Sequence, residues 1–378
     1  MVVAQLSPQL SIAPPIYVTR LVRVISGTWQ RVQYLGLYLN RFDLKLPHNL
    51  STACILVSSL TIGNLQFSNN LIQGPLAGIS CAPFRRLASM YGKPAFTYTE
   101  MISCETLIHD TKNNHRFVAI SPDEGPVCFQ LSSKNPQRLG EAVKLVTDLG
   151  ADLIDLNCGC PVNKIRTRGA GSKHLTNPSH LHDMITAMKS NTHVPVSIKI
   201  RVDGNSHDQY NQEVAQVVRD AGADFLTVHG RHWTDTYDVP CHYEQIQFFV
   251  DALNIPVIGN GDVACIESLK KMLSTGCAGA MIARAGVGQP WLFAKLLAEL
   301  NEQPFELPPH SQIGELFLEH VSELIELMAT EKFAVIQARK FAKYYARHSP
   351  NRAEFTNEVN QCEQFSLLQD IVSRYFMG

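Results

Sequence analysis

The sequence predicts an α/β fold, a (β/α)8 TIM barrel followed by a C-terminal all-helical domain. From about Leu60 onward, short apolar or β-branched runs alternate with amphipathic helical stretches, which is typical of βα units on a parallel sheet. Eight such runs occur before residue 305, which suits the roughly 250 residues of a closed barrel of this type. Beyond 304–309 only helical spacing remains. A doubly wound open sheet is the alternative, but it more often carries a G-x-G-x-x-G after its first strand, and the sequence has none.

The predicted elements follow one another in a regular order. The helix after the third strand begins at Pro136 and ends at Gly150, positions at which proline and glycine are favoured. Its apolar residues fall on one face: Leu139, Ala142, Val143, Val146 and Leu149. The eight strands are predicted near 70–77, 95–101, 126–131, 152–157, 195–201, 224–229, 255–260 and 279–283.

These patterns divide the chain into an N-terminal extension of unknown role (1–60), a barrel domain with the catalytic site (61–305) and a helical domain (310–378). The extension is basic, which is interpreted either as an arm that touches RNA or as a segment outside the fold, ahead of a later translation start. Its charged residues include Arg20, Arg23, Arg31, Arg41, Asp43 and Lys45. In the helical domain, bases cluster between Arg339 and Arg352, which suits a phosphate backbone or a solvated helix face.

Composition excludes several classes of protein. The 378 residues are 45% apolar and 18% charged, which is typical of a globular protein with a sizeable core. A net charge of −1 argues neither for nor against a polyanionic partner, so RNA binding would need a local basic face. The ten cysteines lack the spacing of a disulfide scaffold, and no apolar run is long enough for a membrane span. We therefore expect a cytoplasmic protein without a membrane partner. The sequence does not give the oligomeric state, for which a monomer is the default expectation.

Polar residues or glycines stand at the end of every predicted strand, where a TIM barrel builds its active site. They are Gly74–Gly78, Glu100, Gln130, Asn157–Pro161, Lys199 with Arg201, His229–Arg231, Asn260–Asp262 and Ala283–Arg284. The loops after the seventh and eighth strands are where such barrels bind phosphate. Lys199 and His229 are expected to project into the middle of the barrel mouth, where a cation near the pyrimidine edge of an isoalloxazine would stabilise the negative charge of reduced flavin. This pattern favours FMN, although pyridoxal and sugar phosphates use the same loops.

Cys160 follows the fourth strand in a tight Gly-Cys-Pro turn. A thiol beside a flavin can give a proton to one carbon while hydride reaches its neighbour, which is what saturating C5–C6 of uracil requires. Two other interpretations are a buried loop cysteine and a metal pair with Cys158, but the latter lacks matching ligands and no metal is predicted. Gln130 and Glu100 could also be satisfied polar ends of core strands.

Seven short motifs carry a resemblance to a known family. They are Pro75-Leu76-Ala77-Gly78, Thr99-Glu100-Met101, Asp155-Leu156-Asn157-Cys158-Gly159-Cys160-Pro161, Ser197-Ile198-Lys199-Ile200-Arg201, Val228-His229-Gly230-Arg231, Gly259-Asn260-Gly261-Asp262 and Gly288-Gln289-Pro290-Trp291-Leu292-Phe293. In this order along a barrel they resemble the tRNA-dihydrouridine synthases, from about Leu60 to the C-terminus. Ile62-Gly63-Asn64 and Ala338-Arg339-Lys340 are most similar to the bacterial B-type branch.

The resemblance implies a tRNA substrate, bound FMN and NADPH as the reductant. Hydride would pass from flavin N5 to uridine C6, and Cys160 would give a proton to C5; the B-type branch implies position 17 of the D-loop. The helical domain would bind tRNA, and Asn157, Arg201 and Arg231 would contact the substrate. The implied FMN residues are Pro75, Leu76, Ala77, Gln130, Lys199, His229, Asn260, Gly261, Asp262, Ala283 and Arg284.

The sequence departs from the family pattern at two places in the barrel and in its N-terminal extension, which has no counterpart in that pattern. It also leaves two other functions open. Lys173 and His174 stand where the family has Ala-Leu, and Ala283 stands where it has glycine. One alternative is an FMN barrel that reduces a small molecule, of the dihydroorotate or ene-reductase type, which would not need the helical tail. The other is a non-catalytic RNA-binding barrel, against which the presence of Cys160 and Lys199 argues.

Overall fold

The computed structural model describes residues 19–23 and 29–33 by their backbone alone, and 59–109, 114–203 and 208–378 in detail. The chain forms two compact units, Met1–Cys54 and Ile55–Gly378. In the first unit, β1 (Thr19–Arg23) pairs antiparallel with β2 (Trp29–Gln33). Arg41, Asp43 and Lys45 of the predicted extension lie outside the described residues, as do the side chains of the other arginines there. Its two interpretations therefore stay predictions.

Parallel strands in the second unit close into a ring, because β6 pairs with both β5 and β8. In ring order the described strands are β5 (Leu71–Gln73), β6 (Thr97–Tyr98) with β7 (Ile102–Ser103), β8 (Val127–Ser132), β9 (Leu153–Cys158), β10 (Val196–Arg201), β11 (Phe225–His229), β12 (Val257–Asn260) and β13 (Gly279–Ile282). The predicted (β/α)8 barrel is confirmed. The second predicted strand, 95–101, is wrong in form, because it breaks at Thr99, whose hydroxyl accepts the Gln130 N–H at 3.0 Å. Both halves pair with β8.

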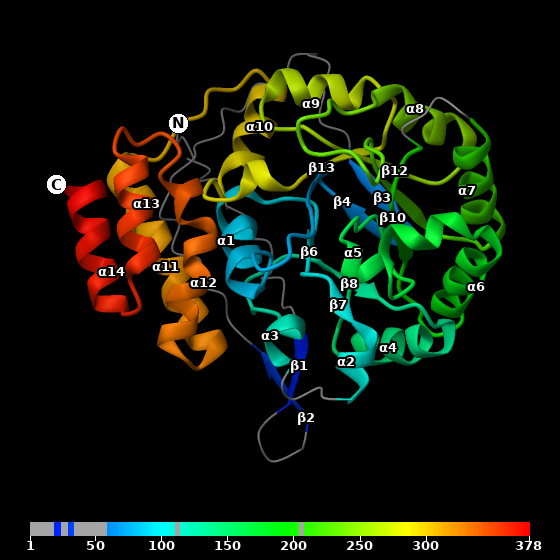
Figure 1. Ribbon diagram of the computed structural model, residues 1–378, viewed down its shortest axis with the longest axis horizontal. Coiled ribbons are helices and arrows are strands. Elements are labelled where there is room, and N and C mark those ends of the chain that lie inside the picture. The colour runs from blue at the N-terminus through cyan, green and yellow to red at the C-terminus, as the bar shows by residue number, and fades with distance from the viewer. Residues whose placement is uncertain (1–18, 24–28, 34–58, 110–113, 204–207) are drawn as a thin grey trace, which may run out of the picture. The chain divides into compact units, whose positions relative to one another are not determined.

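Helices alternate with the strands and surround them (Figure 1). They are α1 (Ala82–Gly92), α2 (Cys104–His109), α3 (His115–Val118), α4 (Pro136–Asp148), α5 (Asn163–Arg166), α6 (Pro178–Lys189), α7 (Asp208–Asp220), α8 (Tyr243–Ala252), α9 (Ile266–Leu273) and α10 (Leu292–Leu300), with short 3₁₀ segments η1 (Gly171–Thr176) and η2 (Arg284–Gly286). Among the described residues, no helix combines the length and apolarity that crossing a membrane requires.

Helix α4 shows how local sequence sets an element. Pro136 stands in its first turn, and the Asn135 side chain accepts the Arg138 N–H at 3.1 Å, so the helix begins with a capped donor. The expectation that Leu149 lies on the buried face is wrong, since Leu149 is 42% exposed. The helix ends at Asp148, and Gly150, at φ +95°, turns the chain away before that face can continue.

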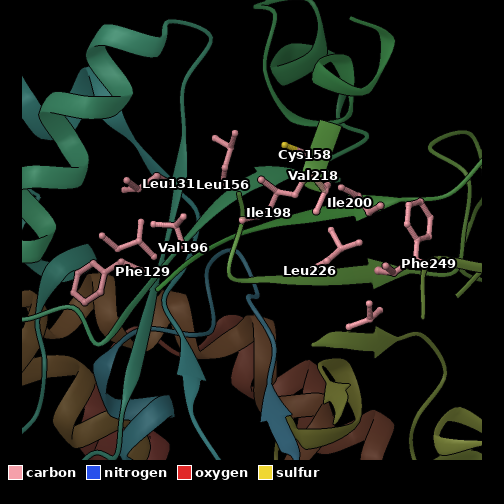
Figure 2. Close-up of a cluster of buried hydrophobic side chains, with 14 of the residues drawn as sticks. Phe129, Leu131, Leu156, Cys158, Val196, Ile198, Ile200, Val218, Leu226 and Phe249 are labelled. Atoms are coloured by element: carbon pink, nitrogen blue, oxygen red, sulfur yellow. The ribbon is translucent and has the colours of Figure 1, made fainter. Parts of the chain in front are cut away.

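Alternate side chains of the strands point outward and inward. Outward residues such as Leu156, Ile198 and Leu226 form the main apolar core against the surrounding helices (Figure 2). The inward core at the amino ends includes Phe96 and Phe225, and the hairpin of β3 (Leu60–Ile62) and β4 (Leu65–Phe67) belongs to the same cluster. The barrel is thus filled and sealed with apolar residues at one end only.

Four further helices and a terminal π-turn follow the barrel: α11 (His310–Met328), α12 (Glu331–Tyr345), α13 (Arg352–Gln361), α14 (Phe365–Val372) and η3 (Ser373–Met377). They share one apolar cluster with α1, in which Phe84 and Leu87 join Phe317 and Phe341. Arg86 of α1 also pairs with Glu319 of α11 at 2.7 Å. The helical region is therefore anchored beside the loop that joins β5 to α1.

Candidate active site

Inward positions become polar toward the carboxyl ends of the strands. In β9 the inward series runs Leu153, Asp155, Asn157, and in β10 it runs Ser197, Lys199. The parallel register places Lys199 opposite Asn157, and it pairs His229 of β11 with Asn260 of β12. The structure therefore brings together side chains that the sequence predicted only as separate strand ends.

Cys160 lies two residues beyond β9, partly buried, with a free thiol. The Asn157 side-chain oxygen accepts the Cys160 N–H at 2.9 Å, and the Cys160 carbonyl accepts the Ser172 N–H at 3.0 Å and hydroxyl at 3.1 Å. Gly171 has φ +62°, and a Cβ there would lie 2.7 Å from the Cys160 carbonyl oxygen. Three neighbours thus fix the backbone of Cys160. Cys158, by contrast, points outward into the apolar core.

Asp155 lies at the centre of a hydrogen-bonded network that the sequence analysis did not single out. Its carboxylate accepts the Ser197 hydroxyl at 2.6 Å and the Gln130 amide at 2.8 Å. The side-chain oxygen of Gln130 accepts a hydrogen bond from the side-chain amide of Asn157 at 2.8 Å, so the network continues to the turn that carries Cys160. Burial raises the pKa of Asp155 to about 6, against the lowering effects of Ser197, Gln130 and Lys199. The Gln130 side chain thus links Asp155 to Asn157 through two hydrogen bonds.

Lys199 is the cation at the centre of this layer. Its ammonium donates to the Asn260 side-chain oxygen at 2.9 Å, and Asn260 in turn donates to the Met281 carbonyl at 3.0 Å. Burial, together with the nearby Arg201, lowers the pKa of Lys199 to about 8, against the raising effect of Asp155. The other Lys199 protons have no hydrogen-bond acceptor within the described part of the chain. The ammonium can therefore still bind an incoming anion or carbonyl.

His229 is 9% exposed and faces several cations. Burial lowers its pKa well below the usual range, and Lys199, Arg201, Arg231 and Arg284 each lower it further. Arg231 lies 3.3 Å from Nε2, which as a neutral ring nitrogen accepts from the guanidinium. His229 is thus neutral at pH 7 and leaves Nδ1 as its proton-bearing nitrogen.

Arg231, which the resemblance assigns to the substrate, is bound to groups of the protein itself in this structure. It is 1% exposed and donates to the Val239 carbonyl at 2.6 Å, and it holds both oxygens of Asp262 at 2.6 and 2.7 Å. The Asp262 carboxylate also accepts the Cys241 N–H, so its side chain is occupied by protein. The Arg231 side chain is buried and that of Asp262 is one-third exposed. A doubly bonded ion pair of this kind fixes the loops after β11 and β12 relative to each other.

Arg201 is largely occupied as well. It is 5% exposed and donates to the Gly159 carbonyl at 2.9 Å and the His232 carbonyl at 2.8 Å. Burial lowers its pKa, and the thiol of Cys160 is among the groups that act on it in the opposite direction. Arg201 therefore joins the Cys160 turn to the loop after β11, and it stands near the thiol.

The loops after β12 and β13 provide donors for a phosphate group. Within the described residues, the backbone N–H groups of Gly261, Asp262 and Arg284 have no hydrogen-bond acceptor. Gly261 has φ +136°, and a Cβ there would lie 2.6 Å from the Cys241 sulfur, so only glycine fits. The exposed Arg284 adds a positive charge beside these donors. Free N–H groups at loop and helix starts, with a cation beside them, are the chemistry of a phosphate site.

The predicted cofactor segment Pro75-Leu76-Ala77 lies in the loop between β5 and α1 and is partly accessible. This loop is held from two sides at Gly78. Its N–H donates to the Glu100 carboxylate, and its carbonyl accepts the Gln337 amide of α12 at 2.5 Å. Lys340 of α12 packs on Gly78 as well, because an added Cβ would lie 2.7 Å from its ammonium. One oxygen of the Glu100 carboxylate is thus bound to the loop, while the other is buried, has no hydrogen-bond partner among the described residues and lies 3.7 Å from the Arg116 guanidinium. Helix α12 contributes contacts that the sequence did not predict.

Comparison with known proteins adds the family. The model of the dihydrouridine synthase (Dus) family matches residues 72–374. Three similar proteins, from Vibrio cholerae, Shewanella oneidensis and Escherichia coli, are each named tRNA-dihydrouridine synthase B. Each is 31% identical to this chain, over 84% of this chain's length. The matched region covers 98% of the Vibrio cholerae and Shewanella oneidensis proteins and 99% of the Escherichia coli protein. The chain belongs to the dihydrouridine synthase family. It is therefore a flavin-dependent oxidoreductase, as the motifs predicted.

Two solved structures are similar to this chain at a low level. They are DHODH from Eimeria tenella in complex with ferulenol, with 16% identity and a TM-score of 0.49 over 68% of this chain and 86% of that chain, and the old yellow enzyme homologue of Zymomonas mobilis, with 12% identity and a TM-score of 0.47 over 66% and 94%. Likeness at this level bears on neither substrate nor cofactor.

Proposed function

We propose that this dihydrouridine synthase family member uses FMN and NADPH to reduce the C5–C6 double bond of a uridine in tRNA. The similar proteins of three bacteria carry that activity in their names. The observation that carries the proposal in this chain is the Cys160 turn, held by Asn157, Gly171 and Ser172 beside a layer of cations and amides. We assign 61–305 to catalysis, 310–378 to tRNA and a cytoplasmic location to the protein; 1–60 is assigned no role.

The donor set of the site fits FMN. The free N–H groups of Gly261, Asp262 and Arg284 suit its phosphate, and the unshared protons of Lys199 suit the pyrimidine edge of the ring. Leu76 and Ala77 offer apolar and backbone contact from the β5–α1 loop, and Asn260 presents Lys199. For Asp262 the backbone, rather than its occupied side chain, is the proposed contact. Pro75, Gln130, His229 and Ala283 complete the proposed cofactor set.

When bound and reduced, FMN supplies a hydride, from N5 to C6 of the uracil. The protein's own part is to bring a proton to C5, and Cys160 is placed to do so with its backbone fixed on both sides. Asn157 orients that turn by accepting the Cys160 N–H, and it would lie beside the bound flavin and base. Arg201 donates to the Gly159 carbonyl and so holds the residue that precedes Cys160 in the turn. The target base has to leave its stack to reach this end of the barrel.

The spectrum of the purified protein tests the proposal. We expect flavin absorption bands that NADPH bleaches under anaerobic conditions and that unmodified tRNA restores, with dihydrouridine appearing in the nucleosides released from the tRNA. A yellow protein that tRNA does not reoxidise would instead indicate a small-molecule reductase. A colourless protein that cannot be reconstituted with FMN would favour the alternative of a non-catalytic RNA-binding barrel.

Substitution of the thiol tests the proton donor. Cys160→Ala should retain flavin and its reduction by NADPH but lose about 10²–10⁴-fold in dihydrouridine formation, the usual contribution of a general acid. Cys265→Ser is the matched control, since Cys265 is exposed and serine keeps a capping oxygen at the start of α9. Full activity in the Cys160 variant would exclude the thiol as the acid.

A further inference from the structure

Two arginine side chains stack on exposed aromatic rings of the loop between β11 and α8. The guanidinium carbon of Arg166 lies 3.5 Å from the ring centre of Trp233, and that of Arg284 lies 3.7 Å from the ring centre of Tyr237. Trp233 is 36% exposed and Tyr237 57% exposed, so much of each ring is in contact with solvent. We call these four residues the rim platform.

The rim platform comes from loops that also carry the candidate active site. Arg166 lies in α5, which follows Cys160; the two aromatic residues follow His229; and Arg284 follows β13. The Arg166 guanidinium donates to the Ser172 hydroxyl at 2.7 Å, and that hydroxyl donates to the Cys160 carbonyl at 3.1 Å. Two hydrogen bonds therefore connect the guanidinium on Trp233 with the residue proposed as proton donor.

The charge around Trp233 favours an anionic partner. Lys164, Arg166 and Arg168 lie within five residues of one another, and the two flanking bases are exposed. The carboxylate of Asp235, in the same loop as Trp233, is occupied by the His232 N–H at 2.7 Å. Exposed rings offer stacking surfaces for bases, and guanidinium groups beside them bind phosphates. A single-stranded nucleic acid combines both groups in one ligand.

We propose that the rim platform binds RNA nucleotides adjacent to the target uridine, with a base against Trp233 and backbone phosphates on Lys164, Arg166 and Arg168. This inference rests on the proposed function and adds a specific RNA contact to it. A base extruded into the barrel leaves its neighbours without a stacking partner on one side, and the indole replaces that partner. Because Arg166 donates to Ser172 and Ser172 donates to the Cys160 carbonyl, the position of this RNA segment affects the position of Cys160.

The test is the binding of a fluorescein-labelled, unmodified tRNA transcript to the flavin-loaded full chain, followed by fluorescence anisotropy. Trp233→Ala should raise the Kd about tenfold, as expected for the loss of one base–aromatic stack. Trp233→Phe keeps a ring and should stay within about threefold of wild type. Arg166→Lys keeps the charge but not the planar stacking group, and it should fall between them.

Arg219→Ala provides the matched control. Its side chain is 56% exposed and lies in the last turn of α7, which leads to the amino end of β11, away from the proposed site. Its Kd should equal that of wild type. Unchanged melting temperature and flavin content in Trp233→Ala would show that the fold is intact.

A wild-type Kd for tRNA in Trp233→Ala would overturn the proposal that the rim platform binds RNA. If the same variant also showed a raised KM for NADPH, the Trp233 ring would be assigned to binding of the nicotinamide substrate instead. The proposed function is judged separately, by dihydrouridine formation in the wild type. If the wild type forms none, that proposal fails, while the comparison of Trp233→Ala with Arg219→Ala still decides whether the platform binds RNA.

Discussion

Replacing Gly171 by alanine separates backbone strain from the placement of the thiol. Gly171 has φ +62° and Gly222 has φ +73°, so alanine at either position meets a similar conformational cost, about 1–2 kcal/mol. The two sites differ in their surroundings. A Cβ at Gly222 meets nothing within 4 Å, whereas a Cβ at Gly171 would lie 2.7 Å from the Cys160 carbonyl oxygen and 3.1 Å from the Cys160 Cβ.

The consequence for catalysis follows from that contact. A carbon cannot stay 2.7 Å from a carbonyl oxygen, so either Cys160 or the Gly171–Ser172 segment has to move by several tenths of an ångström. Because Ser172 donates twice to the Cys160 carbonyl, moving that segment also disturbs the turn. A misplacement of about 1 Å can cost roughly 10²-fold in rate, so a shift of about half that should cost about tenfold.

The assay compares Gly171→Ala with Gly222→Ala for tRNA-dependent reoxidation of reduced flavin, with dihydrouridine measured in the same samples. Both variants should lose a few degrees in melting temperature, at about 2–4 °C per kcal/mol, and both should retain flavin. Only Gly171→Ala should lose rate. Equal rates in the two variants, at equal stability, would refute the claim that Gly171 positions Cys160.

Three other outcomes are expected from the same site. Since the free-protein pKa of Lys199 is lowered to about 8, its charge is lost as pH rises through that value, and FMN affinity measured by flavin fluorescence should decline above it. Asp155→Asn removes the carboxylate that raises the pKa of Lys199, so this decline should begin at lower pH; an unmoved midpoint would contradict the coupling. Gln337→Ala removes the donor to the Gly78 carbonyl and should weaken FMN binding about three- to tenfold, the effect of one lost hydrogen bond. The exposed Gln369→Ala on α14 should leave it unchanged, and equal affinities would argue against a link from α12 to the cofactor loop.

Most of the fold could be predicted because its signals are local. Alternating apolar runs and helix-ending glycines mark each βα unit, and the carboxyl end of each strand follows from the order of the units alone. Asp155 could also have been singled out, since it stands two residues after Leu153 and two before Asn157, on the inward face. A carboxylate at that position of a buried strand needs partners, and Ser197 on the next strand supplies one.

Long-range pairings could not be predicted from such signals. The Gln337 amide and the Gly78 carbonyl are separated by 259 residues, and no pattern in either segment predicts that the two make contact. Arg231 and Asp262 have the same difficulty: each is a charged residue at the end of a barrel strand, which suggests a ligand, yet they neutralise one another. A charged residue at the carboxyl end of a barrel strand therefore indicates a ligand only if it is not already paired with another residue of the protein.

Removal of that pair leaves an excess of positive charge, and the excess indicates what the site binds. Lys199, Arg201 and Arg284 act on His229 along with Arg231, and burial together with these cations keeps the imidazole neutral. Asp155 offsets part of the charge on Lys199, but its own pKa is raised to about 6 by burial, so the protein balances these cations incompletely. Holding like charges together costs free energy, and a bound anion offsets that cost. A phosphate near Arg284 and a ring that becomes negative on reduction near Lys199 would do so at the two places where donors have no acceptor among the described residues.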